Sequence, residues 1–239
     1  MSAPGRPQRE PRAGYREGSP PAARGAAATL TDRAYTALEE MIVRLELPPG
    51  GAVSEAMLSG RLGIGRTPIR EALQRLARER LVQILPRRGV IVSDINVKAQ
   101  LRLLEVRREI ERLVARSAAR RATPDERGRF TALADSFERA ARTNDDVTFL
   151  RIDREFNELC LAAARNEFAT TAMQLMASLS RRFWYLHYKQ AADMPETAKL
   201  HADMARAIAA GDPTAAGTAT DALLDNIEAF TRNTVSTDF

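Results

Sequence analysis

The stretch "GRTPIREALQRL", residues 65–76, decides the fold of the first part of the chain. Its apolar residues recur at helical spacing, namely Ile69, Ala72, Leu73 and Leu76. This spacing predicts an amphipathic helix with one buried stripe. Thr67 followed by Pro68 is typical of an N-cap and a first-turn proline, so we expect the helix to begin there. Three arginines are left at its start and on its open face, namely Arg66, Arg70 and Arg75.

The segments around this helix predict a small domain with a hairpin. Residues 30–47 have helical periodicity and stop at a Pro-Pro-Gly-Gly breaker, and residues 54–64 form a second short helix with Ser54 as its N-cap. After the quoted stretch, "VQIL" and "VIVS" are short β-branched runs on either side of "PRRG". Such a pattern predicts a β-hairpin with a four-residue turn. Three short helices followed by a hairpin indicate a winged helix-turn-helix.

Beyond Asn96 the sequence is helical almost to its end. Its breaks are Thr123-Pro124, Asn144-Asp145, Asn166, Met194-Pro195 and Gly211-Asp212-Pro213. We therefore expect a mainly α protein: a winged helix-turn-helix domain over residues 29–95, then an all-α bundle of about six helices over 96–234.

Both ends of the chain are expected to lack a fold. Residues 1–28 are rich in Pro, Gly and Arg and nearly free of large apolar side chains, so they predict a disordered basic tail. That tail either adds a loose attraction to a polyanion or has no role. Residues 235–239 are expected to be a flexible C-terminus.

Composition excludes several classes of protein. A single cysteine, Cys160, rules out an intramolecular disulfide framework and is expected to be a reduced core residue. No apolar run is long enough for a membrane span, and the N-terminus lacks the apolar segment of a secretory signal. We expect a cytoplasmic protein with no membrane partner.

Positive charge is concentrated on the third helix and the hairpin. From Arg61 to Arg88 there are eight arginines and two acids, on a chain of net charge +5. The N-terminal residues of a helix-turn-helix recognition helix meet base edges in the major groove, where arginine binds guanine bidentately. Arg87 and Arg88 at the hairpin tip are placed to reach a phosphate or the minor groove. The alternative is a solvated basic face, but the helix order, the proline and the hairpin together favour double-stranded DNA as partner.

Residues 45–92 closely resemble the GntR family of bacterial transcription regulators. The positions that match the family pattern are Pro49, Gly50, Ser54, Glu55, Leu58, Arg66, Thr67, Pro68, Arg70, Glu71, Ala72, Leu73 and Gly89. The resemblance implies that Arg66, Thr67 and Arg70 contact DNA, assisted by the wing with Arg87, Arg88 and Gly89.

Three positions depart from that family pattern. Gly65 replaces the usual Ser or Thr, while Leu45 and Arg80 stand where Gly is common. None of the three removes a predicted base-reading arginine, so the departures bear on the operator sequence and not on DNA binding.

Polar residues interrupt the apolar stripes of the bundle. Arg107 shares a face with Leu103, Val106, Ile110 and Leu113, Asp153 lies one turn after Phe149, and Asn157 and His201 border other stripes. A charged group facing a core is costly unless it is paired. One interpretation is a structural Arg107–Asp153 ion pair with His201 nearby. The other is a polar cavity in which Arg107 holds the carboxylate of a small ligand.

A GntR domain followed by such a bundle looks like the FadR-type subfamily with its FCD effector domain. Many members bind a divalent metal through an Asp and three His, and that metal helps hold a carboxylate effector. Asp153 matches the Asp and His201 one His, but Asn157 and Leu223 occupy the other two positions. We therefore expect an effector site at Arg107, Asp153, Asn157 and His201 without a tightly bound metal. No cofactor is expected, and Zn²⁺ is at most a weak ligand.

These observations predict a homodimeric DNA-binding transcription regulator, acting as a repressor, whose operator affinity responds to a small carboxylate or acyl effector. One alternative is a constitutive DNA-binding dimer whose bundle has lost ligand sensing. Another is an all-α metalloenzyme with a DNA-binding appendage. That enzyme needs ligands which a chain with two His, one Cys and no HExxH motif does not provide, so we expect no enzymatic activity.

Overall fold

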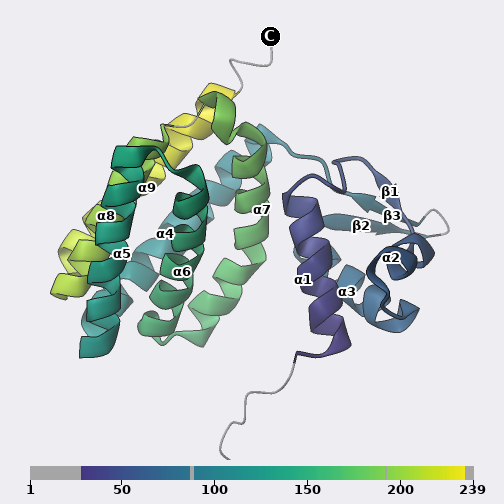
Figure 1. Ribbon diagram of the computed structural model, residues 1–239, viewed down its shortest axis with the longest axis horizontal. Helices are drawn as coiled ribbons and strands as arrows, with labels where there is room; N and C mark the ends of the chain where they lie inside the picture. Colours follow the sequence, from purple (N-terminus) through teal and green to yellow (C-terminus); the bar gives the residue numbers. More distant parts are fainter. Residues whose placement is uncertain (1–27, 87–88, 192, 235–239) are drawn as a thin grey trace, which may run out of the picture.

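The computed structural model describes residues 28–86, 89–191 and 193–234. Nearly all of the predicted tail 1–28, the wing arginines Arg87 and Arg88, and the C-terminal residues 235–239 lie outside the described residues. Figure 1 shows two units side by side, a small one that contains a sheet and a larger helical bundle. Within the described residues the small unit has three helices and the bundle six. The mainly α fold with an N-terminal winged helix-turn-helix is confirmed. Among the described residues, none of the helices has the length and apolar character needed to cross a membrane.

The small unit is called here the winged unit. Its elements are α1 (Leu30–Val43), β1 (Ala52–Val53), α2 (Glu55–Leu62), α3 (Arg66–Arg78), β2 (Val82–Leu85) and β3 (Gly89–Val92). The predicted hairpin is present, since β2 and β3 pair antiparallel from Val82↔Val92 to Leu85↔Gly89. β1 was not predicted, because two residues are too few to show alternation. It adds to the other side of β3 and gives the strand order β1-β3-β2.

The apolar stripe of α3 packs into the core of the winged unit, as its spacing predicts. Ile69, Ala72, Leu73 and Leu76 are all buried, in one cluster with Leu38 and Ile42 of α1. The predicted N-cap is wrong: Gly65 is the N-cap, without a side-chain bond, and Thr67 lies inside the first turn. Pro68 is still tolerated because amides in the first turn have no acceptor within the helix.

Two residues of the winged unit have left-handed backbone. Leu45 has φ 61° and Arg80 has φ 62°. The turn at Leu45 also explains why α1 ends at Val43, earlier than its periodicity predicts. These are the two positions at which the GntR pattern commonly has Gly, and left-handed backbone is the physical reason for that preference.

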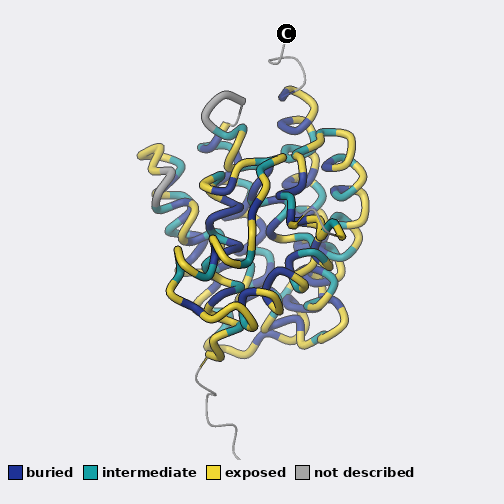
Figure 2. The backbone as a smooth tube through the Cα atoms, turned by 90° about the vertical axis from the view of Figure 1, so that its right-hand side faces the viewer, coloured by how far each residue is buried: buried dark blue, intermediate teal, exposed yellow. Residues whose placement is uncertain are grey.

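In the described part of the chain, six helices form the bundle. They are α4 (Val97–Arg121), α5 (Pro124–Thr143), α6 (Asp146–Ala164), α7 (Glu167–Ala191), α8 (Met194–Ala210) and α9 (Pro213–Asn233). Short polar side chains begin several of them, including the Thr123 capping box and the Asp212 N-cap. The core contains Phe130, Phe137 and Phe156, whose rings meet edge to face. In Figure 2 the buried segments run through the middle of the molecule and the exposed ones along its outside.

The buried face of α4 differs from the predicted stripe. Val106 and Leu113 are 53% and 45% exposed, whereas Leu104, Val114 and Ala118 are buried. The predicted stripe is therefore wrong at Val106 and Leu113. Glu111 is buried as the ion-pair partner of Arg107, so the helix is rotated relative to the expected orientation.

Candidate functional site

The exposed side of α3 carries the predicted DNA contacts. Arg66, Thr67 and Arg70 are all exposed and lie opposite the buried stripe of the helix. Gly89 opens β3 next to the wing with φ 88°, and a Cβ there would lie 3.4 Å from the Val53 carbonyl oxygen. Glycine is therefore the residue that this turn favours. The structure brings the helix start and the wing strand into one unit.

Two of these arginines differ in their surroundings. Arg70 Nε lies 2.8 Å from Oε1 and Nη2 2.7 Å from Oε2 of Glu55, the first residue of α2. The hydrogen bond from Arg70 lowers the pKa of the Glu55 carboxyl, and the charge of Arg66 lowers it further. Arg66 itself makes no hydrogen bond within the described part of the chain, so its guanidinium is open to a partner.

Arg75 does not belong to this face. Its guanidinium lies 3.6 Å from the centre of the Tyr35 ring. It also reaches the buried Glu79 at 3.4 Å, and Glu79 accepts a 2.8 Å hydrogen bond from the Tyr35 hydroxyl. Arg75 therefore ties α3 to α1, a role that helical periodicity does not reveal.

In the bundle, Asp153, Asn157 and His201 come together as predicted. His201 Nε2 lies 3.1 Å from Asp153 Oδ1, and Asn157 Nδ2 donates to the same oxygen at 3.1 Å. His201 Nδ1 lies 2.8 Å from the Thr197 carbonyl oxygen, which only accepts, so Nδ1 carries a proton. Burial raises the pKa of Asp153, but the hydrogen bond and charge of His201 outweigh it and lower that pKa below its usual value.

Arg107 makes a different ion pair from the one expected. Its Nε donates to Glu111 Oε1, four residues along α4, and not to Asp153. Its positive charge still contributes to lowering the Asp153 pKa. The neighbouring Cys160 is buried as predicted, and desolvation raises the pKa of its thiol. We refer to Arg107, Glu111, Asp153, Asn157 and His201 as the central cluster; each of its charged groups faces an opposite one.

The central cluster does not fit the divalent metal of the FCD pattern. Both partners of the Asn157 amide nitrogen are acceptors, Asp153 Oδ1 and the Asp153 carbonyl oxygen, so nitrogen and not oxygen faces the Asp153 carboxylate. Leu223 is buried and offers no donor atom. The described residues contain no group of three or more His, Cys, Asp or Glu side chains placed to hold a metal ion.

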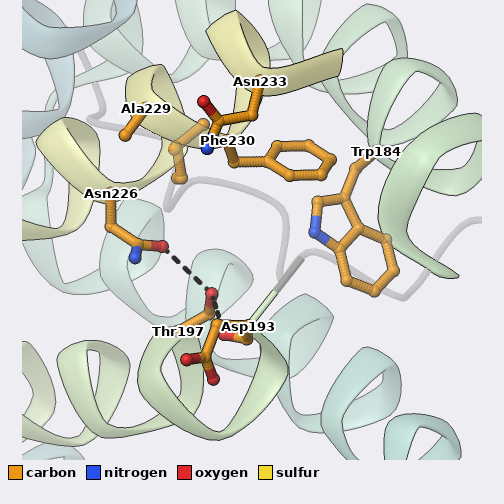
Figure 3. A pocket seen from close by; sticks show the side chains of 8 residues that line it. Trp184, Asp193, Thr197, Asn226, Ala229, Phe230 and Asn233 are labelled. Carbon is orange, nitrogen blue, oxygen red and sulfur yellow. Dashed lines mark hydrogen bonds between the residues drawn. The ribbon is translucent and has the colours of Figure 1, made fainter. Parts of the chain in front are cut away.

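A cavity lies one helical turn from His201 along α8. It has a volume of about 130 Å³, and it is lined by Trp184, Asp193, Thr197, Asn226, Ile227, Ala229, Phe230 and Asn233. Figure 3 shows Trp184 and Asn226 on opposite sides, with the Thr197 hydroxyl 3.1 Å from Asn226 Oδ1. Trp184 packs against Phe149, which in turn contacts the His201 ring. The cavity thus adjoins the central cluster without containing it.

Helix α7 connects the bundle to the winged unit, and Figure 1 shows it on the side facing α1. Arg182 is only 3% exposed, and its Nη1 and Nη2 donate to the carbonyl oxygens of Ser93 (2.7 Å) and Asp94 (3.1 Å). These carbonyls lie on the segment between β3 and α4. Burial lowers the Arg182 pKa to about 10, which leaves it charged at neutral pH.

Two neighbours of Arg182 strengthen this junction. Arg181 Nη1 lies 2.8 Å from Glu39 Oε1 on α1, and Leu179 packs against the apolar core of the winged unit. Sequence reasoning missed the junction, because its partners are about a hundred residues apart or more and nothing local marks them. Residues 179–182, "LSRR", carry no signal in the sequence beyond their charge.

Comparison with known proteins agrees with this architecture. Residues 30–92 match the model of the bacterial regulatory proteins of the gntR family, and residues 102–226 match the FCD domain. The chain is 47% identical over 62 residues to an HTH-type transcriptional regulator in an unstable DNA locus of Streptomyces ambofaciens, a match over 26% of each chain. It therefore spans about a quarter of that relative's length.

Two longer matches cover most of the chain. The HTH-type transcriptional repressor RspR of Escherichia coli is 26% identical over 174 residues, which are 73% of this chain and 76% of that protein. The solved structure of Escherichia coli McbR/YncC superposes with a TM-score of 0.73 over 87% of this chain and 100% of that one, at 19% identity, and so supports the fold. Together with the two family matches, these results show that the chain belongs to the GntR family of transcription regulators, in the FadR-type subfamily that carries an FCD domain.

Proposed function

We propose that this regulator binds its operator as a homodimer through Arg66, Thr67 and Arg70, and that a small molecule in the bundle changes its operator affinity. The exposed start of α3 is the observation that carries the DNA-binding part, together with an Arg66 guanidinium that makes no hydrogen bond among the described residues. Arginine reads guanine bidentately, and a threonine hydroxyl suits a phosphate. Gly89 shapes the wing that would bring Arg87 and Arg88 to the DNA.

The division into two domains supports this arrangement. One apolar cluster lies within the winged unit apart from Leu179 at its edge, and another lies within the bundle. We place the DNA-binding domain at residues 29–95 and the effector and dimerisation domain at 96–234. The protein would act as a repressor in the cytoplasm, where the bacterial chromosome lies.

Two large apolar side chains support a second copy of this chain as partner. Val106 and Leu113 lie seven residues apart on α4, so they share a face, and both are strongly exposed. Apolar residues gathered on an exposed face are typical of an interface. A dimer also places two recognition helices on neighbouring half-sites, about one turn of DNA apart.

The effector would bind at the central cluster, with Arg107, Asp153, Asn157 and His201 as contacts. A carboxylate would compete with Glu111, which accepts from Nε, for the Arg107 guanidinium. Its arrival would change the packing around His201, Phe149 and Trp184, and α7 would carry that change to the junction at Arg182. The paired charges also favour a second candidate, a constitutive DNA-binding dimer without a ligand.

The DNA-binding part is tested with duplexes selected by the protein from a randomised library. Arg66→Ala is expected to weaken binding to the selected duplex by about ten- to a hundredfold and to relax base preference at one position. The control is Arg78→Ala, which removes the same charge at the other end of α3. Equal effects of both variants would contradict a reading role for Arg66.

The effector part is tested by thermal unfolding against a panel of small carboxylates and acyl compounds. A binding acid should raise the melting temperature of the wild type but not of Arg107→Ala, and should weaken binding to the selected duplex. The control is Arg129→Ala, an exposed arginine outside the central cluster. An unresponsive melting temperature across the panel would favour the constitutive dimer.

A further inference from the structure

We propose that Glu55 is a positioning residue for DNA recognition, which holds the Arg70 guanidinium in the orientation that reads a base. This inference rests on the DNA-binding role proposed for Arg70. Two parallel hydrogen bonds of 2.8 and 2.7 Å join the carboxylate to Nε and Nη2. Such a fork fixes both the position and the plane of a guanidinium.

The contact leaves the reading edge of Arg70 free. A guanidinium has five N–H donors, and the Glu55 fork uses the Nε hydrogen and one Nη2 hydrogen. Both Nη1 hydrogens and the second Nη2 hydrogen remain, and these form the end of the group that binds guanine O6 and N7 side by side. Glu55 therefore holds one edge of Arg70 and leaves the other exposed.

Stability alone does not account for this pair. The side chains of Arg70 and Glu55 are 60% and 31% exposed, and ion pairs at such exposure contribute little to folding. Glu55 also lies in the first turn of α2, where an acidic residue is favourable, but that effect needs no partner on α3. A guanidinium held in place before binding loses less side-chain entropy when it meets a base.

A negative charge at this place has a further consequence. DNA phosphates repel Glu55, so it lowers affinity for any duplex regardless of sequence. Orientation of Arg70 raises affinity only for the correct sequence. Loss of Glu55 should therefore lower specific binding while leaving non-specific binding equal or stronger, a signature that a merely structural residue would not give.

Glu55→Gln tests the inference, because glutamine keeps the size of the side chain but replaces one fork acceptor with a donor. Binding of the full chain is measured by fluorescence anisotropy on a duplex selected by the wild type and on a scrambled duplex of equal composition. We expect the ratio of the two dissociation constants to fall by about tenfold in Glu55→Gln. In an Arg70→Ala background, the same change should have no further effect on that ratio.

Glu46→Gln is the matched control. Glu46 forms a 2.8 Å ion pair with Arg61, also across the surface of the winged unit, and both side chains are about half exposed. Its loss should leave the ratio unchanged. An equal fall in Glu46→Gln, or tighter binding of Glu55→Gln to the selected duplex, would overturn the inference. A wild type that enriches no sequence would instead overturn the proposed function, and the role of Arg70 with it.

Discussion

The exposed face of α3 and the central cluster of the bundle both combine arginine with carboxylate, but their charges are used differently. On α3, Arg66 makes no hydrogen bond to any residue that the structure describes, and Arg70 keeps one edge free. In the central cluster, Arg107 faces Glu111 and His201 faces Asp153, so each charge is satisfied within the protein. The difference teaches that an exposed arginine with free donors is available to a partner directly, whereas the paired charges of the central cluster first have to be separated.

The largest expected effect comes from breaking the closed cluster. Asp153→Ala removes the carboxylate that His201 Nε2 and Asn157 share, and leaves both without it in the core. The free energy of unfolding should fall by about 3 kcal/mol in urea denaturation. Glu155→Ala is the control, since Glu155 makes only long ion pairs at the surface of the same helix. Similar losses in both variants would show that the cluster is not a closed unit.

The pH dependence of stability is a second test of the Asp153–His201 pair. The pKa of Asp153 lies below its usual 3.8, so the carboxylate stabilises the fold at higher pH and loses that contribution as the pH falls through its folded-state value. As the pH falls below about 4, the free energy of unfolding of the wild type should therefore decrease more than that of Asp153→Asn. Parallel curves of unfolding free energy against pH would contradict this.

The next prediction concerns Zn²⁺ binding to a central cluster in which the metal ligands of the FCD pattern are restored. Asn157→His with Leu223→His restores the two missing donors of the FCD pattern. Excess Zn²⁺ should stabilise this double variant by about 2–3 kcal/mol and leave the melting temperature of the wild type unchanged. Reversal by EDTA is the control for non-specific binding. A Zn²⁺-dependent shift in the wild type would show that Asp153 and His201 suffice.

An intermediate effect is expected at the junction, where Nη1 and Nη2 of the buried Arg182 donate to backbone carbonyls. Arg182→Met keeps most of the side-chain volume but leaves the Ser93 and Asp94 carbonyls without their donors. Stability should fall by about 2 kcal/mol, and amide hydrogen exchange near residues 93–96 should accelerate. Arg154→Met, which removes an exposed arginine from Glu40, is the control. Unchanged exchange would argue against α7 as the connection between the units.

The smallest effect concerns Arg80, an exposed arginine outside the proposed DNA contacts. Arg80→Gly should stabilise the protein by about 0.5–1 kcal/mol, because it relieves left-handed backbone at φ 62°. Arg80→Ala keeps that backbone strain and should give no gain. Both variants are measured by thermal unfolding. A large loss of binding to the selected duplex in Arg80→Gly would mean that Arg80 belongs to the recognition face after all.

The sequence predicts the features that follow from local pattern. The α3 stripe, the hairpin strands and the meeting of Asp153 with His201 all follow from helical or strand spacing and from the family resemblance. The choice of partner for each charged side chain does not follow from local pattern. Arg107 pairs with Glu111 on its own helix and not with Asp153, and the burial of Glu111 depends on how α4 packs against other helices. The Arg182 contacts join residues 88 or 89 positions apart, with no periodic signal at either end.

The position of Leu179 bears on how such regulators exchange domains in evolution. Leu179, a side chain of the bundle, packs against the apolar core of the winged unit, and the neighbouring Arg182 holds the segment that leaves that unit. Recombination that exchanges DNA-binding modules between regulators at residue 96 would separate each module from the helix that closes it. Productive exchange therefore requires the acceptor bundle to supply an equivalent apolar residue and arginine, so the two halves of this gene are expected to have evolved as a pair.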